Sequence, residues 1–454
     1  MANVNTPVVQ LLRDSLGDAV STASADLAAA RADHSGRVSG GVPLAVVSAR
    51  TIADVQTTMR IANEHSVPVV PRGAGTGLAG GAIGDTGEIV LSTLAMNHIL
   101  EINVGDELAV VEPGIINDDL NAALAEYGLW FAPDPASKAI SSVGGNIATN
   151  AGGLLCAKYG VTREAVLGLK IVLADGSLMT LGHRTVKGVT GYDLTALLIG
   201  SEGTLGVIVE ATLKLRPLPT GPMATIGAYF DTIERAAKAS AAITAARLRP
   251  AAMELVGQSA LVGIGEFLGL DLGARGSHLL VQFDGAAAAT DAESAVGIIR
   301  SLGGDAEVTN DETEGERLFA IRRAFHPAMA VQGTVLIEDV AVPRSQLSAM
   351  FAAITAIEQK YGMVIPTVAH AGDGNLHPNF IFAGSEVPEA VWTASDELFE
   401  ACLRLGGTLT GEHGVGVLKR RWLRDELGDQ QVELQRALKQ VFDPKNILNP
   451  GKIF

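Results

Sequence analysis

Residues 69–81 read Val69-Val-Pro-Arg-Gly-Ala-Gly-Thr-Gly-Leu-Ala-Gly-Gly81, an apolar stretch that runs straight into a series of glycines. Their spacing matches the G-x-G-x-x-G fingerprint of a Rossmann fold, but that fingerprint requires a helix directly after the loop. The continuation through Gly87 has too many glycines to form one. A strand followed by exposed backbone N–H groups can instead form a nest for an anion such as a pyrophosphate, with Arg72 and Thr76 as further donors. A purely structural glycine-rich turn is the alternative.

Two more segments of this character follow in the first half of the chain. One runs from Ala132-Pro-Asp-Pro-Ala-Ser137 to Ser141-Ser-Val-Gly-Gly-Asn-Ile-Ala-Thr-Asn-Ala-Gly-Gly153, and the other is Gly200-Ser-Glu-Gly-Thr-Leu-Gly-Val-Ile208. Glycines and small side chains let a flat ring approach the backbone closely. Each segment alone is weak evidence. Together with residues 69–81 they suit a long dinucleotide that is held from several sides.

Composition excludes several classes of protein. A chain of 454 residues is long enough for two or three domains, and 47% hydrophobic residues suffice for their cores. The net charge of −16 argues against nucleic acid and against an anionic membrane surface as partners. Two cysteines imply no disulfide framework. The sequence has no signal-peptide pattern and no apolar run near 18 residues, so we expect a soluble cytoplasmic protein without a transmembrane segment.

The pattern of elements changes near residue 220. A helical lead-in (1–35) precedes a mixed α/β region that ends at Leu215-Arg-Pro-Leu-Pro219, where two prolines interrupt regular structure. Beyond it, alanine-rich helices alternate with strands, which is typical of an α+β layer. The last forty residues contain two helices, expected at about 417–427 and 431–441.

The stretch Val368-Ala-His-Ala-Gly-Asp-Gly-Asn-Leu-His-Pro378 carries the strongest chemical signal. Asp-Gly is typical of a type I′ hairpin turn, and a turn centred on it would place His370 directly opposite His377. Two imidazoles about 4.5–5.5 Å apart at Cβ can share one metal ion. Gly411-Glu-His-Gly414 offers an acidic ligand and a base side by side. The alternative is a solvated or hydrogen-bonded pair of histidines without a ligand.

Taken in order, these segments closely resemble the FAD-linked D-2-hydroxy-acid dehydrogenases, which include D-lactate dehydrogenase, the glycolate oxidase flavin subunit and D-2-hydroxyglutarate dehydrogenase. The matching motifs are PRGAGTGLAGG (71–81), PDPAS (133–137), SSVGGNIATNAGG (141–153), VKGVTGYDL (186–194), GSEGTLGVI (200–208), HAGDGNLHPNF (370–380), GEHGVGVLKR (411–420) and ILNPGKIF (447–454). Eight motifs in family order make a chance match very unlikely.

The resemblance implies an α+β fold with a two-subdomain FAD-binding domain of the vanillyl-alcohol-oxidase (PCMH) type and an α/β cap domain with an antiparallel sheet. The expected boundaries are an N-terminal lead-in (1–35), the FAD-binding domain (36–219), the substrate or cap domain (220–410) and a C-terminal segment that returns to the FAD site (411–454).

The family match also assigns residues to FAD. Some relatives attach the flavin covalently through a histidine in the pyrophosphate loop, and because this chain has none there, we expect noncovalent FAD. The predicted FAD contacts are Pro71, Arg72, Gly73, Ala74, Gly75, Thr76, Gly77, Leu78, Pro133, Asp134, Ser137, Ser142, Gly144, Gly145, Asn146, Thr149, Asn150, Gly152, Glu202, Gly203, Gly206, Ile208 and Asn449.

By the same resemblance, a divalent metal is held by His370, His377 and Glu412, with Zn²⁺ expected and Mn²⁺ or Fe²⁺ as alternatives. His413 is the catalytic base. Arg322 matches the arginine that holds the substrate carboxylate, a role that suits the bidentate guanidinium. Its neighbour Arg323 is the second candidate, and for either arginine a surface helix charge is the alternative.

The resemblance implies a small D-2-hydroxy acid as substrate, with D-lactate or a glycolate-like acid favoured. In the hydroxyglutarate branch a lysine is expected near position 337, where this chain has Ile337, which argues against a dicarboxylate. His326 is a further polar candidate, though an ordinary helix residue is the simpler interpretation. The implied electron acceptor is an electron-transfer flavoprotein, a quinone or a partner subunit, and a homodimer remains open.

Three other functions fit the sequence less well. A metallohydrolase built on the histidines leaves the glycine segments unexplained. A non-redox flavoenzyme of the same fold does not account for the histidine and glutamate set. A noncatalytic flavin-binding subunit does not fit an apparently complete site.

Overall fold

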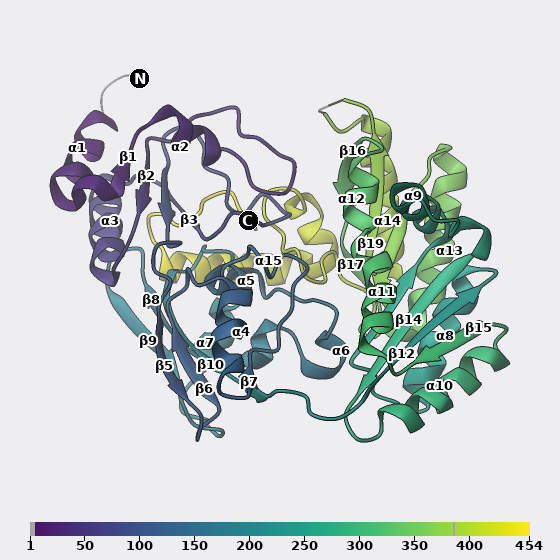
Figure 1. Cartoon of the computed structure of the whole chain (residues 1–454). Coiled ribbons are helices and arrows are strands. Elements are labelled where there is room, and N and C mark those ends of the chain that lie inside the picture. The colour runs from purple at the N-terminus through teal and green to yellow at the C-terminus, as the bar shows by residue number, and fades with distance from the viewer. Residues whose placement is uncertain (1–4, 385) are drawn as a thin grey trace. The chain divides into compact units, whose positions relative to one another are not determined.

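The computed structural model describes residues 5–384 and 386–454, which divide into two compact units (Figure 1). Unit 1 contains the chain up to residue 152 together with 160–218 and 412–454, whereas unit 2 contains 153–159 and 219–411. The chain passes between the units at residues 218/219 and 411/412 as well, whereas the domain bounds expected from the sequence stay predictions. The lead-in is part of unit 1, and its first four residues lie outside the described part of the chain.

Unit 1 contains two main sheets. The first has the order β1-β2-β4-β3, in which the pairs β2/β4 and β3/β4 are parallel. Helix α3 begins after a capping box between Thr51 and Asp54 and ends at His65, followed by Ser66 with a left-handed φ of 54°. Its apolar face packs with α1 on this sheet. The lead-in is therefore not wholly helical, since Val20–Ser21 adds the edge strand β1.

The second sheet of unit 1 is antiparallel, in the order β5-β6-β10-β8-β9. A large apolar core fills the space between it and the helices α4, α5 and α7. The elements of unit 1 are α1 (Asn5–Leu16), β1 (Val20–Ser21), α2 (Ser24–Ala29), β2 (Ala45–Ser48), α3 (Ile52–His65), β3 (Val69–Arg72), β4 (Ile89–Ser92), β5 (Ile99–Asn103), β6 (Leu108–Val111), α4 (Asn117–Ala125), β7 (Leu129–Trp130), α5 (Val143–Thr149), β8 (Val166–Val172), β9 (Leu178–Gly182), α7 (Leu194–Leu198), β10 (Val207–Lys214), β11 (Arg216–Pro217) and α15 (Leu423–Phe442).

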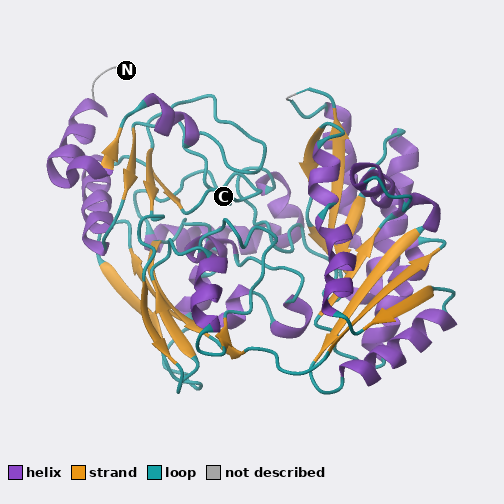
Figure 2. Cartoon of the chain, in the orientation of Figure 1, coloured by secondary structure: helices purple, strands orange, loops and turns teal. Residues whose placement is uncertain are grey.

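Unit 2 is built on one antiparallel sheet in the order β15-β12-β14-β13-β18-β19-β16, with β17 also paired to β19. Helices cover both faces (Figure 2): α8 and α10 pack on one, and α9, α11 and α12 on the other. The elements are α6 (Cys156–Tyr159), β12 (Met223–Phe230), α8 (Ile233–Ala245), β13 (Ala252–Val256), α9 (Gln258–Leu268), β14 (Ser277–Asp284), α10 (Ala288–Ser301), β15 (Asp305–Thr309), α11 (Glu312–Arg323), α12 (Phe325–Ala330), β16 (Thr334–Ile337), β17 (Val340–Ala341), α13 (Leu347–Tyr361), β18 (Thr367–His370), β19 (Asn375–Phe382) and α14 (Glu389–Arg404).

The C-terminal helices differ in part from the expectation. The first was expected from residue 417 but begins at Leu423. Two helical segments are present as expected, because α15 (Leu423–Phe442) is divided by a kink at the non-helical Gly428 (φ 72°, ψ 163°). Residues 415–419 instead form part of a loop whose backbone bonds to Ala79 and to Glu202. Across residues 5–384 and 386–454, the structure has no helix that is both long and apolar enough to cross a membrane.

Candidate functional site

The first glycine segment is a tightly packed loop with no helix behind it, as expected. An added Cβ at Gly73 would lie 2.3 Å from the hydroxyl of Ser142, so the first and second segments touch. Gly75 has a φ of +73°, and a Cβ there would lie 2.2 Å from the guanidinium of Arg72. That guanidinium donates from Nη1 to the carbonyl of Ala82 at 2.7 Å, and burial lowers its pKa.

The second segment corrects an expectation, because part of it is a helix. Helix α5 begins after Ser142, whose Oγ accepts a hydrogen bond from the Gly145 N–H at 3.3 Å. Adjacent glycines disfavour a helix by themselves. Here Gly144 lies against Pro113, where an added Cβ would approach its Cβ to 2.5 Å. Tertiary packing therefore requires the small residue and overrides its low propensity.

The third segment and the C-terminal residues meet in the same unit. Glu202 is buried and has a φ of 50°. Its carboxylate accepts from the N–H groups of Val415 at 2.7 Å and Gly416 at 2.8 Å, and burial raises its pKa to about 7. Asn449 donates to the carbonyls of Gly81 at 2.9 Å and Glu202 at 2.8 Å. The first and third glycine segments are thereby tied to the C-terminal end of the chain.

Three buried polar atoms on these segments fit a bound cofactor. Among the described residues, none hydrogen-bonds to Ser141 Oγ, Asn146 Nδ2 or Asn449 Oδ1. A buried polar group without a partner costs about 1–3 kcal/mol, so such groups normally face a ligand or water. A nucleotide with a flat ring requires hydrogen-bond donors and acceptors next to backbone that it can approach closely. These three atoms lie beside glycines at which an added Cβ would clash. The residues therefore fit FAD, whereas each individual FAD contact stays a prediction.

Several other predicted FAD contacts also have roles within the protein. Thr149 donates to the carbonyl of Gly145 at 3.3 Å, and Asn150 closes α5 in a left-handed conformation while accepting from the Arg163 N–H at 2.9 Å. Gly203 has a φ of +72° against Pro71. The remaining residues are buried or half-buried, namely Ala74, Thr76, Gly77, Leu78, Pro133, Asp134, Ser137, Gly152, Gly206 and Ile208.

In unit 2, the histidine hairpin has a register different from the one expected. His370 pairs with Asn375 and His377 with Val368, so the two histidines are not directly opposite. The loop has four residues, with only Gly374 at positive φ (96°), and is therefore not a type I′ turn. The rings still meet, with centroids 5.1 Å apart and planes at 82°. Positions two apart on one strand share a face, so His377 reaches His370 diagonally.

Each histidine has a buried carboxylate beside it. His370 Nδ1 lies 2.8 and 2.9 Å from the two oxygens of Glu254, the residue opposite it on β13. His377 Nδ1 lies 3.8 Å from Asp339 Oδ1. Asp339 also accepts from Asn375 Nδ2 and Thr410 Oγ1, both at 2.6 Å. Metal-binding histidines typically donate their second ring N–H to a carboxylate, so this arrangement fits a divalent metal.

Arg322 is the inward arginine of the predicted pair. It lies buried on α11 and donates from Nε to Glu254 Oε2 at 2.9 Å, so Glu254 joins it to His370. Among the described residues, none accepts a hydrogen bond from its Nη atoms. Arg323 points outward and pairs with Glu316 at 2.5 Å. His326 lies half-buried at the start of α12, with its ring 5.4 Å from that of Phe325.

Glu412 and His413 follow directly on Gly411, the last residue of unit 2. Gly411 is packed against Asn375, since an added Cβ would lie 2.3 Å from Nδ2. His370 and His377 belong to unit 2 and Glu412 to unit 1, so the predicted ligand set draws on both units and stays a prediction. His413 is largely buried, and its Nε2 lies 3.9 Å from Glu412 Oε1.

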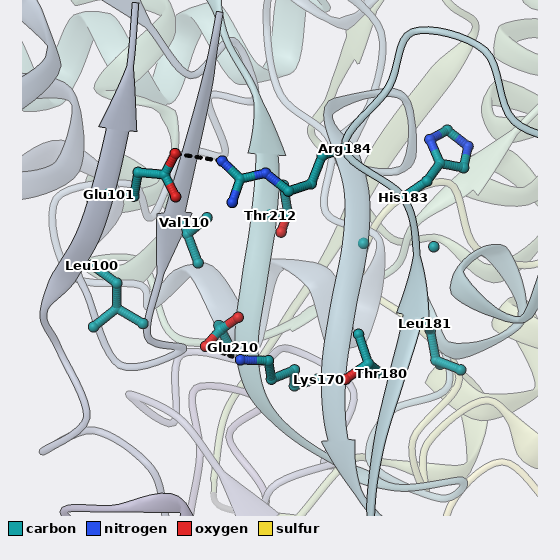
Figure 3. A pocket seen from close by; sticks show the side chains of 12 residues that line it. Leu100, Glu101, Val110, Lys170, Thr180, Leu181, His183, Arg184, Glu210 and Thr212 are labelled. Atoms are coloured by element: carbon teal, nitrogen blue, oxygen red, sulfur yellow. Dashed lines mark hydrogen bonds and ion pairs between the residues drawn. The ribbon is translucent and has the colours of Figure 1, made fainter. Parts of the chain in front are cut away.

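A separate groove of about 440 Å³ lies on the second sheet of unit 1 (Figure 3). Its cations are paired on the sheet itself: Lys170 bonds Glu210 at 2.9 Å, and Arg184 pairs with Glu101. None of the predicted site residues lines it. The groove is best explained as the solvated face of the sheet.

Glu254 and Asp339 are not among the site residues predicted from the sequence. Glu254 stands in the otherwise apolar strand Ala252-Met-Glu-Leu-Val256, which is buried throughout. A single acidic residue in a buried apolar strand must have a hydrogen-bond or charge partner, so its isolation in the sequence could have marked Glu254 as a site residue. Asp339 follows Glu338 between two short strands and carried no comparable signal.

Two family models match the chain. The family described as "FAD linked oxidases, C-terminal domain" matches residues 222–453, and "FAD binding domain" matches 43–182. The chain is 41% identical over 422 residues to glycolate oxidase subunit GlcD of Bacillus subtilis, covering 91% of this chain and 89% of that protein. It is 37% identical over 413 residues to D-lactate dehydrogenase of Archaeoglobus fulgidus, covering 90% of each.

Solved structures share the fold at low sequence identity. The substrate-bound p-cresol methylhydroxylase aligns with a TM-score of 0.81 at 18% identity, covering 99% of this chain and 96% of that chain. The 4-ethylphenol oxidase of Gulosibacter chungangensis aligns with a TM-score of 0.78 at 18% identity, covering 100% and 97%. These matches confirm the expected fold class.

Proposed function

We propose, because the chain belongs to the family of FAD-linked oxidases, that it oxidises a small D-2-hydroxy acid to the 2-keto acid, with D-lactate or a glycolate-like acid favoured. That it is an FAD-linked oxidoreductase follows from the family itself. The relatives named above are a glycolate oxidase subunit and a D-lactate dehydrogenase, both of which act on 2-hydroxy acids.

The observation that carries the proposal is the buried connection from Arg322 through Glu254 to His370, with His377 beside it. A 2-hydroxy acid presents a carboxylate next to a hydroxyl. The two Nη groups of Arg322 can donate a bidentate pair of hydrogen bonds to the carboxylate. His370, His377 and Glu412 would hold a metal ion, which would supply Lewis acidity to the hydroxyl.

Each residue has a task in this scheme. When bound, the metal would acidify the 2-hydroxyl as a Lewis acid, and noncovalent FAD would accept the Cα hydride at N5. His413 takes the hydroxyl proton as general base. Arg322 fixes the orientation of the acid, so that hydroxyl and Cα hydrogen point to their acceptors. The glycine segments of unit 1 hold the dinucleotide.

Two alternatives remain in view. D-2-Hydroxyglutarate would need a cation for its second carboxylate, and the position where that branch would place a lysine is Ile337 on β16. A non-redox flavoenzyme of the same fold is the other alternative. Ile337 disfavours the dicarboxylate, and the carboxylate-backed histidine pair favours hydroxy-acid oxidation over non-redox chemistry.

Anaerobic mixing with a panel of D- and L-2-hydroxy acids tests the proposal. D-lactate or glycolate should bleach the flavin absorbance, D-2-hydroxyglutarate should bleach it more slowly, and L-lactate should leave it oxidised. A flavin that no D-2-hydroxy acid reduces would refute the proposal. Acid denaturation should release the flavin into solution, and flavin that stays on the precipitated protein would contradict noncovalent binding.

The electron acceptor is the remaining part of the reaction. We infer that reduced flavin passes electrons to an electron-transfer flavoprotein, a quinone or a partner subunit. Mixing the substrate-reduced enzyme with each acceptor in turn would identify the one that restores the oxidised spectrum fastest.

A further inference from the structure

We propose that Glu254 is a positioning residue that sets the metal-binding face of His370 and the orientation of Arg322 at the same time. The inference rests on the proposed function, because it assigns Glu254 a role toward the metal and the substrate carboxylate. Nothing in the eight family motifs includes Glu254. It stands on β13, in a strand whose other residues are apolar.

The contacts of Glu254 are set by the sheet. Glu254 and His370 are cross-strand partners of β13 and β18, so their side chains leave the same face. Helix α11 covers this face, since Leu318 contacts the position of Gly227 there and an added Cβ would lie 3.2 Å away. Arg322, one turn further along α11, reaches the same carboxylate at 2.9 Å. Glu254 is fully buried, with 0% exposure.

The chemistry of the carboxylate fixes the histidine tautomer. An ionised carboxylate only accepts hydrogen bonds, so His370 Nδ1 must carry its proton at 2.8–2.9 Å from Glu254. The ring lone pair is then on Nε2, which is the atom that would bind a metal. The same contact raises the basicity of the ligand and holds the ring in place.

The second contact acts on Arg322. Its Nε donates to Glu254 Oε2 at 2.9 Å, which fixes the plane of the guanidinium. The two Nη groups remain for a substrate carboxylate, and less side-chain freedom is lost when it binds. One buried carboxylate therefore orients both a metal ligand and the substrate arginine.

Replacement of Glu254 by glutamine separates the effect of its hydrogen bonds from the effect of its side-chain volume. The variant Glu254→Gln keeps the shape but offers one oxygen and an NH₂ group. If the oxygen stays on Arg322, the NH₂ group faces His370 Nδ1 and is satisfied only when Nδ1 lacks its proton. That tautomer moves the proton to Nε2 and removes the lone pair that would bind the metal.

Zn²⁺ affinity of the purified FAD-loaded chain, measured by competition with a chromogenic chelator, tests the inference without relying on turnover. Glu254→Gln should weaken Zn²⁺ binding about 10- to 100-fold with unchanged FAD content. In the metal-saturated enzyme, the KM for D-lactate should also rise. Glu358→Gln is the matched control in unit 2, because Glu358 is half-buried and accepts from the Ile365 N–H at 2.7 Å. It should bind Zn²⁺ like the wild type.

Equal Zn²⁺ affinity in Glu254→Gln and the wild type would overturn the inference, and so would a wild type that binds no Zn²⁺. In the second case, bleaching of the flavin by 2-hydroxy acids would still support the proposed function. Conversely, weak Zn²⁺ binding in Glu254→Gln with no bleaching in the wild type would refute the function but support the positioning role. If Glu254→Gln does not fold, Glu254→Asp decides: its shorter side chain should weaken Zn²⁺ binding, and unchanged binding would overturn the inference.

Discussion

The buried carboxyl of Glu202 makes the unfolding free energy of unit 1 depend on pH. Burial raises its pKa from 4.5 to about 7. A group with a raised folded pKa contributes its full stability below the unfolded pKa, and this is lost as pH rises toward the folded pKa. A shift of about 2.5 units corresponds to about 3 kcal/mol, so we expect that loss between pH 4.5 and pH 7 or slightly above.

The variant Glu202→Gln should show a different pH profile. Its amide does not titrate, so the decline of about 3 kcal/mol between pH 4.5 and pH 8 should be absent. The amide also accepts only one of the two N–H groups of Val415 and Gly416, which should cost about 1–3 kcal/mol at every pH. The variant should therefore be less stable than the wild type at pH 5, and equal or more stable at pH 8.

Urea unfolding at saturating FAD, followed by the flavin fluorescence that appears on release, measures this difference in the unit that contains Glu202. Because Glu202 is itself a predicted FAD contact, the FAD affinity of each protein is measured at each pH and its contribution is subtracted before the profiles are compared. Glu126→Gln, at an exposed position at the end of α4, is the control and should run parallel to the wild type. A Glu202→Gln profile that also runs parallel to the wild type would refute the reasoning.

Three further outcomes follow from single residues. Burial lowers the pKa of His278 to about 4, so the wild type should lose about 3 kcal/mol as pH falls from 6.5 through 4, and urea titrations of His278→Leu should lack this loss. Gly75→Ala should weaken FAD binding about tenfold in an equilibrium titration, because Gly75 has a positive φ and the added Cβ would displace the side chain of Arg72. Gly87 also has a positive φ, but its added Cβ would meet no atom within 4 Å, so Gly87→Ala should bind FAD like the wild type. His413→Ala should lower kcat by about 10² or more in steady-state assays while FAD stays bound, and an unchanged rate would contradict its role as base.

Local patterns in the sequence were enough to predict the loop of unit 1. The glycines after Val69 disfavour a helix, and the structure has no helix between Val69 and Asn117. The same reasoning failed for α5, where Ser142 caps a helix that contains two adjacent glycines. The difference is tertiary: Gly144 must lie against Pro113, a neighbour that the local sequence does not reveal.

The hairpin register failed for a similar reason. A two-residue turn was expected from Asp373-Gly374 alone. In the structure, Gly374 is pressed against the carbonyl of Val342, where an added Cβ would lie 2.1 Å away, and its own carbonyl accepts from the Val342 N–H at 3.0 Å. The strand before Val342 also pairs with β19. A third strand therefore shapes the loop, and two-strand reasoning could not include it.

The histidines nevertheless came together, because a slip of two residues preserves the face of a strand, whereas a slip of one would have inverted it. The prediction that the two histidines lie together tolerates this register error, because it requires only that both side chains leave the same face of neighbouring strands. The partners of the histidines are a different matter. Glu254 is 116 residues from His370 in the chain, and it reaches Nδ1 only because β13 lies next to β18 in the sheet. The order of strands in the sheet thus decides which distant residues contact the predicted ligands. Sequence motifs do not contain that order, so such residues are found only from the structure.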